Sequence, residues 1–293
     1  MRAALSDLEF SVRGRLDGLL QGNHLGLVPG PGTEPGEARP YQPGDDVRRM
    51  DWAVTARTAE PHIRQPVADR ELETWAALDL SASLDFGTAA CDKRELAVAA
   101  LAAIAHLTRG GGNRIGAVAD SGERIERVPA RGGAAHARAL LRKVAEVPRP
   151  EEGTRGDLAR LAGSLRRPPR RRGLAVVISD FLGSTDWQRE LRGLGARHSL
   201  LAVEVLDPRD VELPDAGTVL LSDPETGKRR EVQTTPVLRR EFAAAASQHR
   251  AEVAAALRRA GAAHLVLRTD SDWIADIVRF VVARKRGWSG GAA

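Results

Sequence analysis

Five oxygen-bearing side chains stand where a parallel sheet would gather them, and together they could hold a metal ion. They are Asp79, Ser81, Ser83, Thr154 and Asp180. The set has carboxylates and hydroxyls but no histidine or cysteine, which is the chemistry that Mg²⁺ and Mn²⁺ prefer. The alternate spacing of residues 79, 81 and 83 fits a turn that points three side chains into one crevice. Such an ion would keep at least one water, leaving a position for a carboxylate of another protein.

The predicted strands explain why these residues should meet. The segments 174–179 and 200–205 are continuous apolar runs, typical of strands buried on both faces of a parallel sheet. Trp75–Leu80 is a third buried strand that ends in a polar loop. Because ligands of open α/β sheets bind at the carboxyl ends of the strands, Asp79 and Asp180 are predicted to lie at one edge of the sheet.

Strands alternate with helices along most of the chain, which predicts an α/β fold, a doubly wound and mostly parallel sheet. Asp92 precedes one predicted helix by one residue, and Glu95 follows three residues later, as in a capping box. The predicted helices are 3–21, 93–108, 134–147, 156–165, 237–259 and 271–284, and the further strands are 114–119, 123–128 and 264–267.

The domain organisation follows from shifts in composition. Residues 1–70 form an N-terminal helix and a Gly- and Pro-rich segment, and residues 71–286 form the sheet domain. Turn residues at Asp223–Gly227 indicate a β-hairpin insertion over about 208–234. Residues 287–293 are expected to be a disordered tail.

Composition excludes several protein classes. With 42% hydrophobic and 28% charged residues, the chain is an ordinary globular protein that can bury a core. Its single cysteine, Cys91, cannot form an internal disulfide. No stretch approaches the roughly 20 apolar residues of a membrane-spanning helix. We therefore expect a cytoplasmic protein without a membrane span.

The net charge of +5 raises the question of nucleic acid. Five arginines, Arg166, Arg167, Arg170, Arg171 and Arg172, surround a Pro-Pro pair. The run has no interleaved aromatic residues, and no nucleic-acid motif accompanies it. We interpret it as a solvated loop and predict no nucleic-acid partner, with a basic nucleic-acid-binding protein as an alternative.

Asp79-Leu-Ser-Ala-Ser83 resembles the Asp-x-Ser-x-Ser element of the metal-ion-dependent adhesion site in von Willebrand factor A domains. Thr154 is similar to the threonine of that site, and Asp180 to its distal aspartate. The resemblance implies that Asp79, Ser81, Ser83 and Thr154 contact the ion directly or through water. It further implies that Asp180 acts through water. It also implies partner binding rather than catalysis. Alternatively, the serines and Thr154 could cap the segments that follow them.

A second resemblance covers residues from about 20 to 280. The segment from Arg39 to Trp52 is similar to the signature of a bacterial family labelled domain of unknown function number 58, which couples it to a von Willebrand A-like domain. Thr55-Ala-Arg57 and Asp223–Gly227 also resemble that family. Members often occur beside MoxR-type AAA+ ATPases, which implies such an ATPase or its client as partner. Many relatives carry N-terminal transmembrane helices, and this chain shows none.

The signature segment concentrates charge around one aromatic side chain. The residues are Asp45, Asp46, Arg48, Asp51 and Trp52. They fit an internal salt-bridge network that fixes a loop. The alternative is a partner-binding surface near the metal.

Catalysis is the main competing function. A metal-assisted phosphohydrolase could use Asp79 at the strand end as its nucleophile. Aspartyl phosphatases of this class need a second acid two residues later, and here that position is Ser81, which cannot act as a general acid or base. Neither a Gly-rich phosphate loop nor a nucleophile elbow is present. We therefore predict that the protein is not an enzyme but an adaptor or co-chaperone that binds Mg²⁺ or Mn²⁺.

Overall fold

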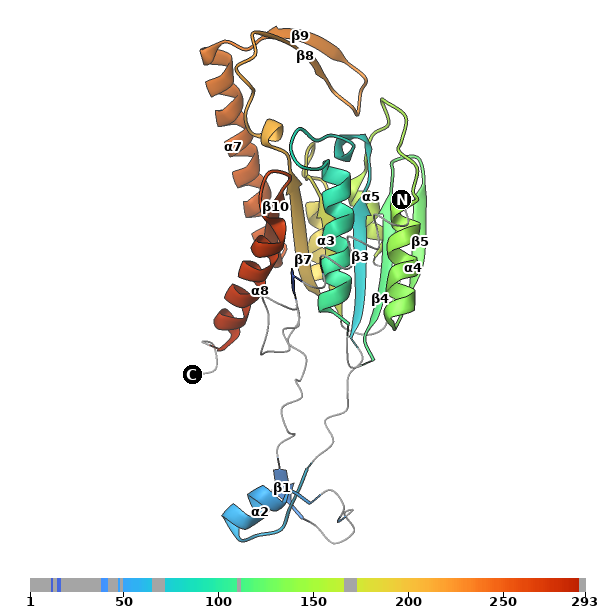
Figure 1. The fold of residues 1–293 in the computed structure, drawn as a ribbon, viewed down its shortest axis with the longest axis vertical. Coiled ribbons are helices and arrows are strands. Elements are labelled where there is room, and N and C mark those ends of the chain that lie inside the picture. The colour runs from blue at the N-terminus through green and yellow to red at the C-terminus, as the bar shows by residue number, and fades with distance from the viewer. Residues whose placement is uncertain are drawn as a thin grey trace. The chain divides into compact units, whose positions relative to one another are not determined.

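The computed structural model describes residues 12, 15–16, 38–41, 47, 50–64, 72–109, 112–165 and 173–289 (Figure 1). The chain forms two compact units. Pro29–Glu71 is one, and Met1–Val28 together with Leu72–Ala293 is the other.

A six-stranded sheet forms the centre of the larger unit. Its strand order is β10-β7-β6-β3-β4-β5, and only β5 is antiparallel to its neighbour. In sequence order, β3 is the first strand of the sheet. The strands β4 and β5 are added on one side of it, and β6, β7 and β10 on the other, so the sheet is doubly wound as predicted. The strands are β3 (Glu73–Asp79), β4 (Arg114–Asp120), β5 (Ile125–Arg131), β6 (Leu174–Ser179), β7 (Ser199–Leu206) and β10 (Ala262–Arg268).

Helices cover both faces of this sheet. Alternate residues of β3 point to opposite sides, so Ala76 and Leu78 join one apolar cluster while Trp75 and Ala77 join the other. The first cluster includes residues of α3 (Lys93–Leu107), α4 (Ala134–Ala145) and α8 (Trp273–Ser289). The second includes residues of α5 (Leu158–Ser164), α6 (Gln188–Gly195) and α7 (Pro236–Arg259).

Two local details test the sequence analysis. The capping box at the start of α3 is confirmed, because Asp92 accepts from the Glu95 amide at 2.7 Å and Glu95 accepts from the Asp92 amide at 3.2 Å. Helix α6 was not predicted. It has eight residues, and its N-cap, Trp187, makes no side-chain hydrogen bond to the first turn, so neither a long apolar pattern nor a capping residue marks it in the sequence.

The described N-terminal residues pack with the sheet. Val12 and Leu16 are helical, lie four residues apart and are buried in the first apolar cluster. Arg15 Nη2 lies 2.6 Å from Asp272 Oδ2, which precedes α8. The described residues of this segment thus contribute to the core of the unit that contains the six-stranded sheet.

The smaller unit is built on a short antiparallel pair. Strand β1 (Ala38–Pro40) pairs with β2 (His62–Arg64), and α2 (Trp52–Thr58) lies between them in sequence. Asp51 caps α2, since its carboxylate accepts from the amides of Ala53 and Val54. Among the described residues, β1 and β2 pair with each other and form a separate two-stranded sheet.

A β-hairpin interrupts the larger unit between β7 and α7. Strands β8 (Thr218–Ser222) and β9 (Arg229–Gln233) form their own two-stranded sheet. The hairpin arches over one end of the central sheet (Figure 1). Two short 3-10 helices, η2 (Ala82–Leu84) and η3 (Pro208–Asp210), follow β3 and β7. None of the helices in the described ranges is long and apolar enough to cross a membrane.

Asp207 holds together the loops at the carboxyl end of the sheet. Its carboxylate is fully buried and accepts from the Thr88 amide at 2.7 Å, the Thr88 hydroxyl at 2.6 Å and the Thr269 hydroxyl at 2.9 Å. Burial alone would raise the pKa of Asp207, but these bonds and the Arg209 amide hold it below its usual value. The loop after β3, the end of β10 and η3 are thus tied to one side chain.

Replacing Asp207 by Ala should lower the free energy of unfolding by about 2–4 kcal/mol, because several buried donors lose their acceptor. Urea denaturation monitored by circular dichroism measures this. Asp270→Ala is the matched control, since Asp270 is half-exposed and pairs with Arg268. That control should cost no more than about 1 kcal/mol. Equal losses in the two variants would contradict the assigned role of Asp207.

Candidate functional site

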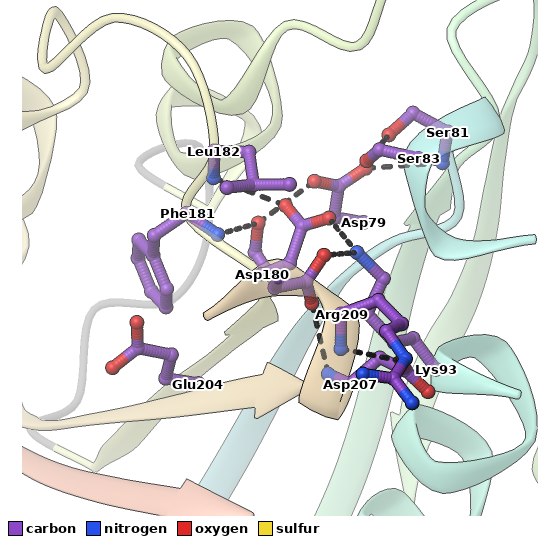
Figure 2. A network of polar contacts seen from close by, with 12 residues as sticks. Asp79, Ser81, Ser83, Lys93, Asp180, Phe181, Leu182, Glu204, Asp207 and Arg209 are labelled. Carbon is purple, nitrogen blue, oxygen red and sulfur yellow. Dashed lines mark hydrogen bonds and ion pairs between the residues drawn. The ribbon is translucent and has the colours of Figure 1, made fainter. Parts of the chain in front are cut away.

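The site lies where the strand order reverses. Strands β3 and β6 are adjacent and parallel, with Leu78 paired to Ile178. The chain leaves β3 toward one side of the sheet and β6 toward the other. Asp79 ends β3 and Asp180 directly follows β6, so their carboxylates meet above this point (Figure 2). A doubly wound sheet binds its ligands at such a place.

Asp79 is held by the residues around it. Its Oδ1 accepts from the Ser81 amide at 3.0 Å, and its Oδ2 accepts from the Ser179 hydroxyl at 2.8 Å. The first bond turns the chain sharply after β3, and the hydroxyl oxygens of Ser81 and Ser83 then lie 3.3 Å apart. All four side chains are buried. The chain therefore gathers one carboxylate and two hydroxyls in a few residues, as the spacing predicted.

Asp180 is neutralised by a buried lysine. Lys93 Nζ lies 2.9 Å from Asp180 Oδ2 and 3.2 Å from Asp210 Oδ1, and the Lys93 side chain is 1% exposed. The other oxygen of Asp180 accepts from the Leu182 amide at 3.1 Å, and the Ser83 hydroxyl donates to the same carboxylate. Lys93 is the first residue of α3, so the capping box at Asp92 sets its position.

The two carboxylates differ in acidity. Burial, with a contribution from the charge of Asp180, raises the pKa of Asp79 to about 6. For Asp180, burial acts in the same direction, but the ammonium of Lys93 and the hydrogen bonds hold its pKa below the usual value. Burial opposes the charge of Lys93, yet Asp180 and Asp210 raise its pKa. Asp180 and Lys93 are therefore charged at neutral pH, and Asp79 titrates near the lower end of the physiological range.

The donor set fits a hard divalent cation. The candidate ligands are the carboxylate of Asp79 and the hydroxyls of Ser81 and Ser83, and all of them are oxygen atoms. Gly156 covers the site with backbone alone, because a Cβ on Gly156 would lie 2.8 Å from Ser81 Oγ and 3.6 Å from Asp79 Oδ1. Within the described ranges, no three His, Cys, Asp or Glu side chains converge closely enough to hold an ion. An ion here would therefore depend on the hydroxyls of Ser81 and Ser83 beside Asp79.

Thr154 belongs to the same loop as Gly156 but faces another residue. Its hydroxyl donates to Glu123 Oε1 at 3.1 Å. Its methyl group lies against Gly122, where a Cβ would come within 2.7 Å of it. The structure thus brings Asp79, Ser81, Ser83 and Asp180 together, while the Thr154 hydroxyl bonds to Glu123.

The residues of the signature segment are described in part. The Asp51 carboxylate caps α2, and the Trp52 side chain is 71% exposed. Asp45, Asp46 and Arg48, like the arginine run at 166–172, lie outside the described residues.

Sequence reasoning missed three residues of the site, namely Ser179, Lys93 and Asp210. Ser179 directly precedes Asp180, and its place at a strand end was a usable signal. Lys93 and Asp210 lie 117 residues apart, and neither belongs to a motif. Only the packing of α3 and η3 against the end of β6 reveals them.

A sequence profile described as "Protein of unknown function DUF58" matches residues 37–252. An uncharacterized protein of Mycobacterium bovis is 62% identical over 287 residues, which cover 98% of this chain and 90% of that protein. An uncharacterized protein of Paracoccus denitrificans, named for the moxR 3′ region, is 40% identical over 97 residues, which are 33% of this chain and 89% of that protein. The crystal structure of a conserved hypothetical protein, BatB from Bacteroides thetaiotaomicron, aligns with a TM-score of 0.42 and 14% identity over 73% of this chain and 99% of that one.

The raised pKa of Asp79 predicts a pH-dependent stability in metal-free buffer. The pKa is about 6 in the folded protein against 3.8 for an unperturbed aspartate, so the folded state keeps its proton to higher pH and stability falls as pH rises through this window. At about pH 8, Asp79→Asn should therefore raise the free energy of unfolding by on the order of 1–3 kcal/mol, and the gain should vanish below about pH 4.

Urea denaturation in EDTA at both pH values measures this effect. Asp186→Asn is the control, because Asp186 is exposed and accepts a hydrogen bond from Ser184. The control should change stability little at either pH. If Asp79→Asn is no more stable than the parent at the higher pH, burial does not raise the pKa of Asp79.

Proposed function

This chain belongs to the family of proteins of unknown function called DUF58, and on that premise we propose that it is a metal-ion-dependent protein-binding module. The ion is Mg²⁺ or Mn²⁺, held by Asp79, Ser81 and Ser83. The ligand is an acidic side chain of a partner, whose carboxylate completes the coordination of the ion. The module acts as an adaptor or co-chaperone for a MoxR-type AAA+ ATPase.

One observation carries the proposal: the Asp79 carboxylate and the hydroxyls of Ser81 and Ser83 converge beside Asp180, at the point where the strand order reverses. Hydroxyl ligands are weak, and they leave the ion open to a stronger ligand from outside. The resemblance to the metal-ion-dependent adhesion site of von Willebrand factor A domains supports the same chemistry, with Asp180 acting through water. In that comparison Thr154 is a further ligand, which requires its hydroxyl to leave Glu123.

The charges at the site favour a cation. The ammonium of Lys93 pairs with Asp180 and Asp210, and the Asp79 carboxylate interacts with the charge of Asp180. Negative charge therefore remains uncompensated in a buried place once Asp79 is ionised, and a divalent ion would offset it. Asp180 is already paired with the ammonium of Lys93. We therefore expect the direct ligands of the ion to be Asp79, Ser81 and Ser83 rather than Asp180. When bound, the ion supplies an electrophilic centre for a carboxylate oxygen.

The choice of partner rests on the relatives. The matched protein of Paracoccus denitrificans is named for the moxR 3′ region, and it covers 33% of this chain. A gene beside moxR suggests joint action with the ATPase that moxR encodes. An adaptor of this kind would present clients to the ATPase, or hold the ATPase through an acidic side chain.

Titration calorimetry with Mg²⁺ and Mn²⁺ tests the ion site. The parent should bind one ion, and Asp79→Asn should lower the affinity at least about tenfold, since a carboxylate binds a hard cation better than an amide does. Asp186→Asn removes an equal charge outside the site and should bind like the parent. Because Asp79→Asn is expected to be well folded, its loss of binding cannot be ascribed to unfolding.

The partner is tested by adding a MoxR-type AAA+ ATPase from the same organism. Association should require Mg²⁺ or Mn²⁺, should disappear with EDTA and should be lost in Asp79→Asn. An ion-independent complex of equal affinity would contradict the metal-dependent mechanism. Parent protein that binds no ion, with or without the ATPase, would contradict the metal site itself.

A further inference from the structure

The turn after β6 has a backbone conformation that needs support from its surroundings. Phe181 has a φ of 52°, in the left-handed region that large side chains rarely adopt. A residue in this region persists only where neighbouring groups hold it, and such residues cluster at ligand sites. The turn begins with Asp180, and its conformation decides where that carboxylate points. The groups that hold Phe181 therefore also hold Asp180.

Two consecutive side chains of α7 bond to the carbonyls of this turn. Arg250 Nη1 donates to the Asp180 carbonyl at 2.7 Å, and His249 Nε2 donates to the Phe181 carbonyl at 3.1 Å. Because a carbonyl can only accept, His249 carries a proton on Nε2 in this contact. The Phe181 ring is buried against Trp187, with 5.3 Å between the ring centroids. The backbone of Phe181 is thus held from α7, and its side chain from the start of α6.

A buried carboxylate fixes the guanidinium of Arg250. Glu204 is 1% exposed, and its carboxylate pairs with Arg250 Nη1 and, at 2.7 Å, with His264 Nε2. In the register of β6 and β7, Glu204 lies directly beside Ser179, at the strand end where the turn begins. A buried charge is costly unless it is paired, so this pair confines the guanidinium to one place. Glu204 therefore keeps Arg250 within reach of the Asp180 carbonyl.

The same turn is bonded to both carboxylates of the site (Figure 2). The Phe181 amide donates to the Ser179 hydroxyl at 3.0 Å, and that hydroxyl donates to Asp79 Oδ2 at 2.8 Å. The Leu182 amide donates to Asp180 Oδ1 at 3.1 Å. A change of φ at Phe181 would redirect the two amides that flank its Cα and C atoms along the chain. It would therefore disturb the bonds of Asp79 and Asp180 together.

We propose that His249 and Arg250 are positioning residues of the site, through which α7 holds the turn after β6 in the conformation that sets Asp180 and Ser179. Neither side chain is a ligand of the ion. They keep the ligands oriented before an ion arrives, so that binding does not have to rearrange the turn. The inference rests on the proposed metal-dependent function and deepens it. It makes that function depend on a helix whose contact lies 70 residues from Asp180 in sequence.

The test removes each bond to the turn in the full chain. His249→Phe keeps a ring but loses the donor, and it leaves no buried charge unpaired. His249→Gln is the conservative variant, because its side-chain amide can donate from the position of Nε2. Arg250→Met combined with Glu204→Gln removes the second bond together with the charge that Arg250 compensates.

A control variant separates positioning from stability. Leu257 is a buried residue of α7 in the second apolar cluster, eight residues beyond His249, which is about 12 Å along the helix. Leu257→Ala should therefore lower the thermal midpoint of unfolding without removing a bond to the turn.

Hydrogen exchange and titration calorimetry are the two measurements. Without metal, the amides of Phe181 and Leu182 should exchange at least about tenfold faster, relative to the amides of β3, in His249→Phe and in the double variant. The affinity for Mn²⁺ should fall about tenfold in the same two proteins. His249→Gln should restore both values to near those of the parent. Leu257→Ala should keep the affinity of the parent and the same relative exchange.

The contrary outcomes are distinct. If Asp79→Asn loses the ion while His249→Phe and the double variant bind Mn²⁺ like the parent, the positioning role is overturned and the proposed function stands. That role is also overturned if Leu257→Ala weakens Mn²⁺ binding as much as they do, because the loss would then follow stability alone. A parent that binds no Mn²⁺ overturns the metal-dependent function and, with it, the role of α7 toward the ion.

Discussion

Two buried carboxylates, Asp79 and Asp180, are brought together because β3 and β6 are neighbours in a parallel sheet and both strands end at the same edge. Like charges in a poorly solvated place repel, and the folded chain answers with Lys93, which bonds Asp180 but not Asp79. One carboxylate is thereby kept ionised, while the other keeps a raised pKa. The two carboxylates therefore differ: Asp180 is part of a buried ion pair, and Asp79 is the carboxylate to which the proposed function assigns the cation.

The surrounding loops are arranged to maintain this asymmetry. The capping box at Asp92 starts α3 at Lys93. Asp207 fixes η3, from which Asp210 provides the second partner of the ammonium. The elements that hold Lys93 come from both sides of the strand-order reversal. A substitution in any of these elements would disturb the pairing of Lys93 with Asp180. It would thereby alter the charge next to Asp79 without changing Asp79 itself. The polar end of this sheet is thus one connected network, although its members are far apart in sequence.

The loop at Gly156 and the β8–β9 hairpin limit access to the site. Gly156 covers Ser81 with backbone alone, and the hairpin tip rests on the same loop through Gly153 and Glu152. In the proposed function, a partner that reaches the site would therefore meet the hairpin as well.

The sequence by itself determined the α/β class, the order of most strands and helices, the capping box and the local cluster of Asp79, Ser81 and Ser83. These features depend on apolar periodicity and on neighbours within a few residues, which a linear pattern records. It also placed Asp180 at a strand end, because the buried run before it is continuous. It did not reveal helix α6, which is short and has no side-chain cap at its start, or the packing of Val12 and Leu16 on the sheet. Only the tertiary structure decided that Lys93 neutralises Asp180 and that the Thr154 hydroxyl bonds to Glu123. The physical reason is that electrostatic pairing acts through space, between residues whose separation in sequence leaves no periodic trace.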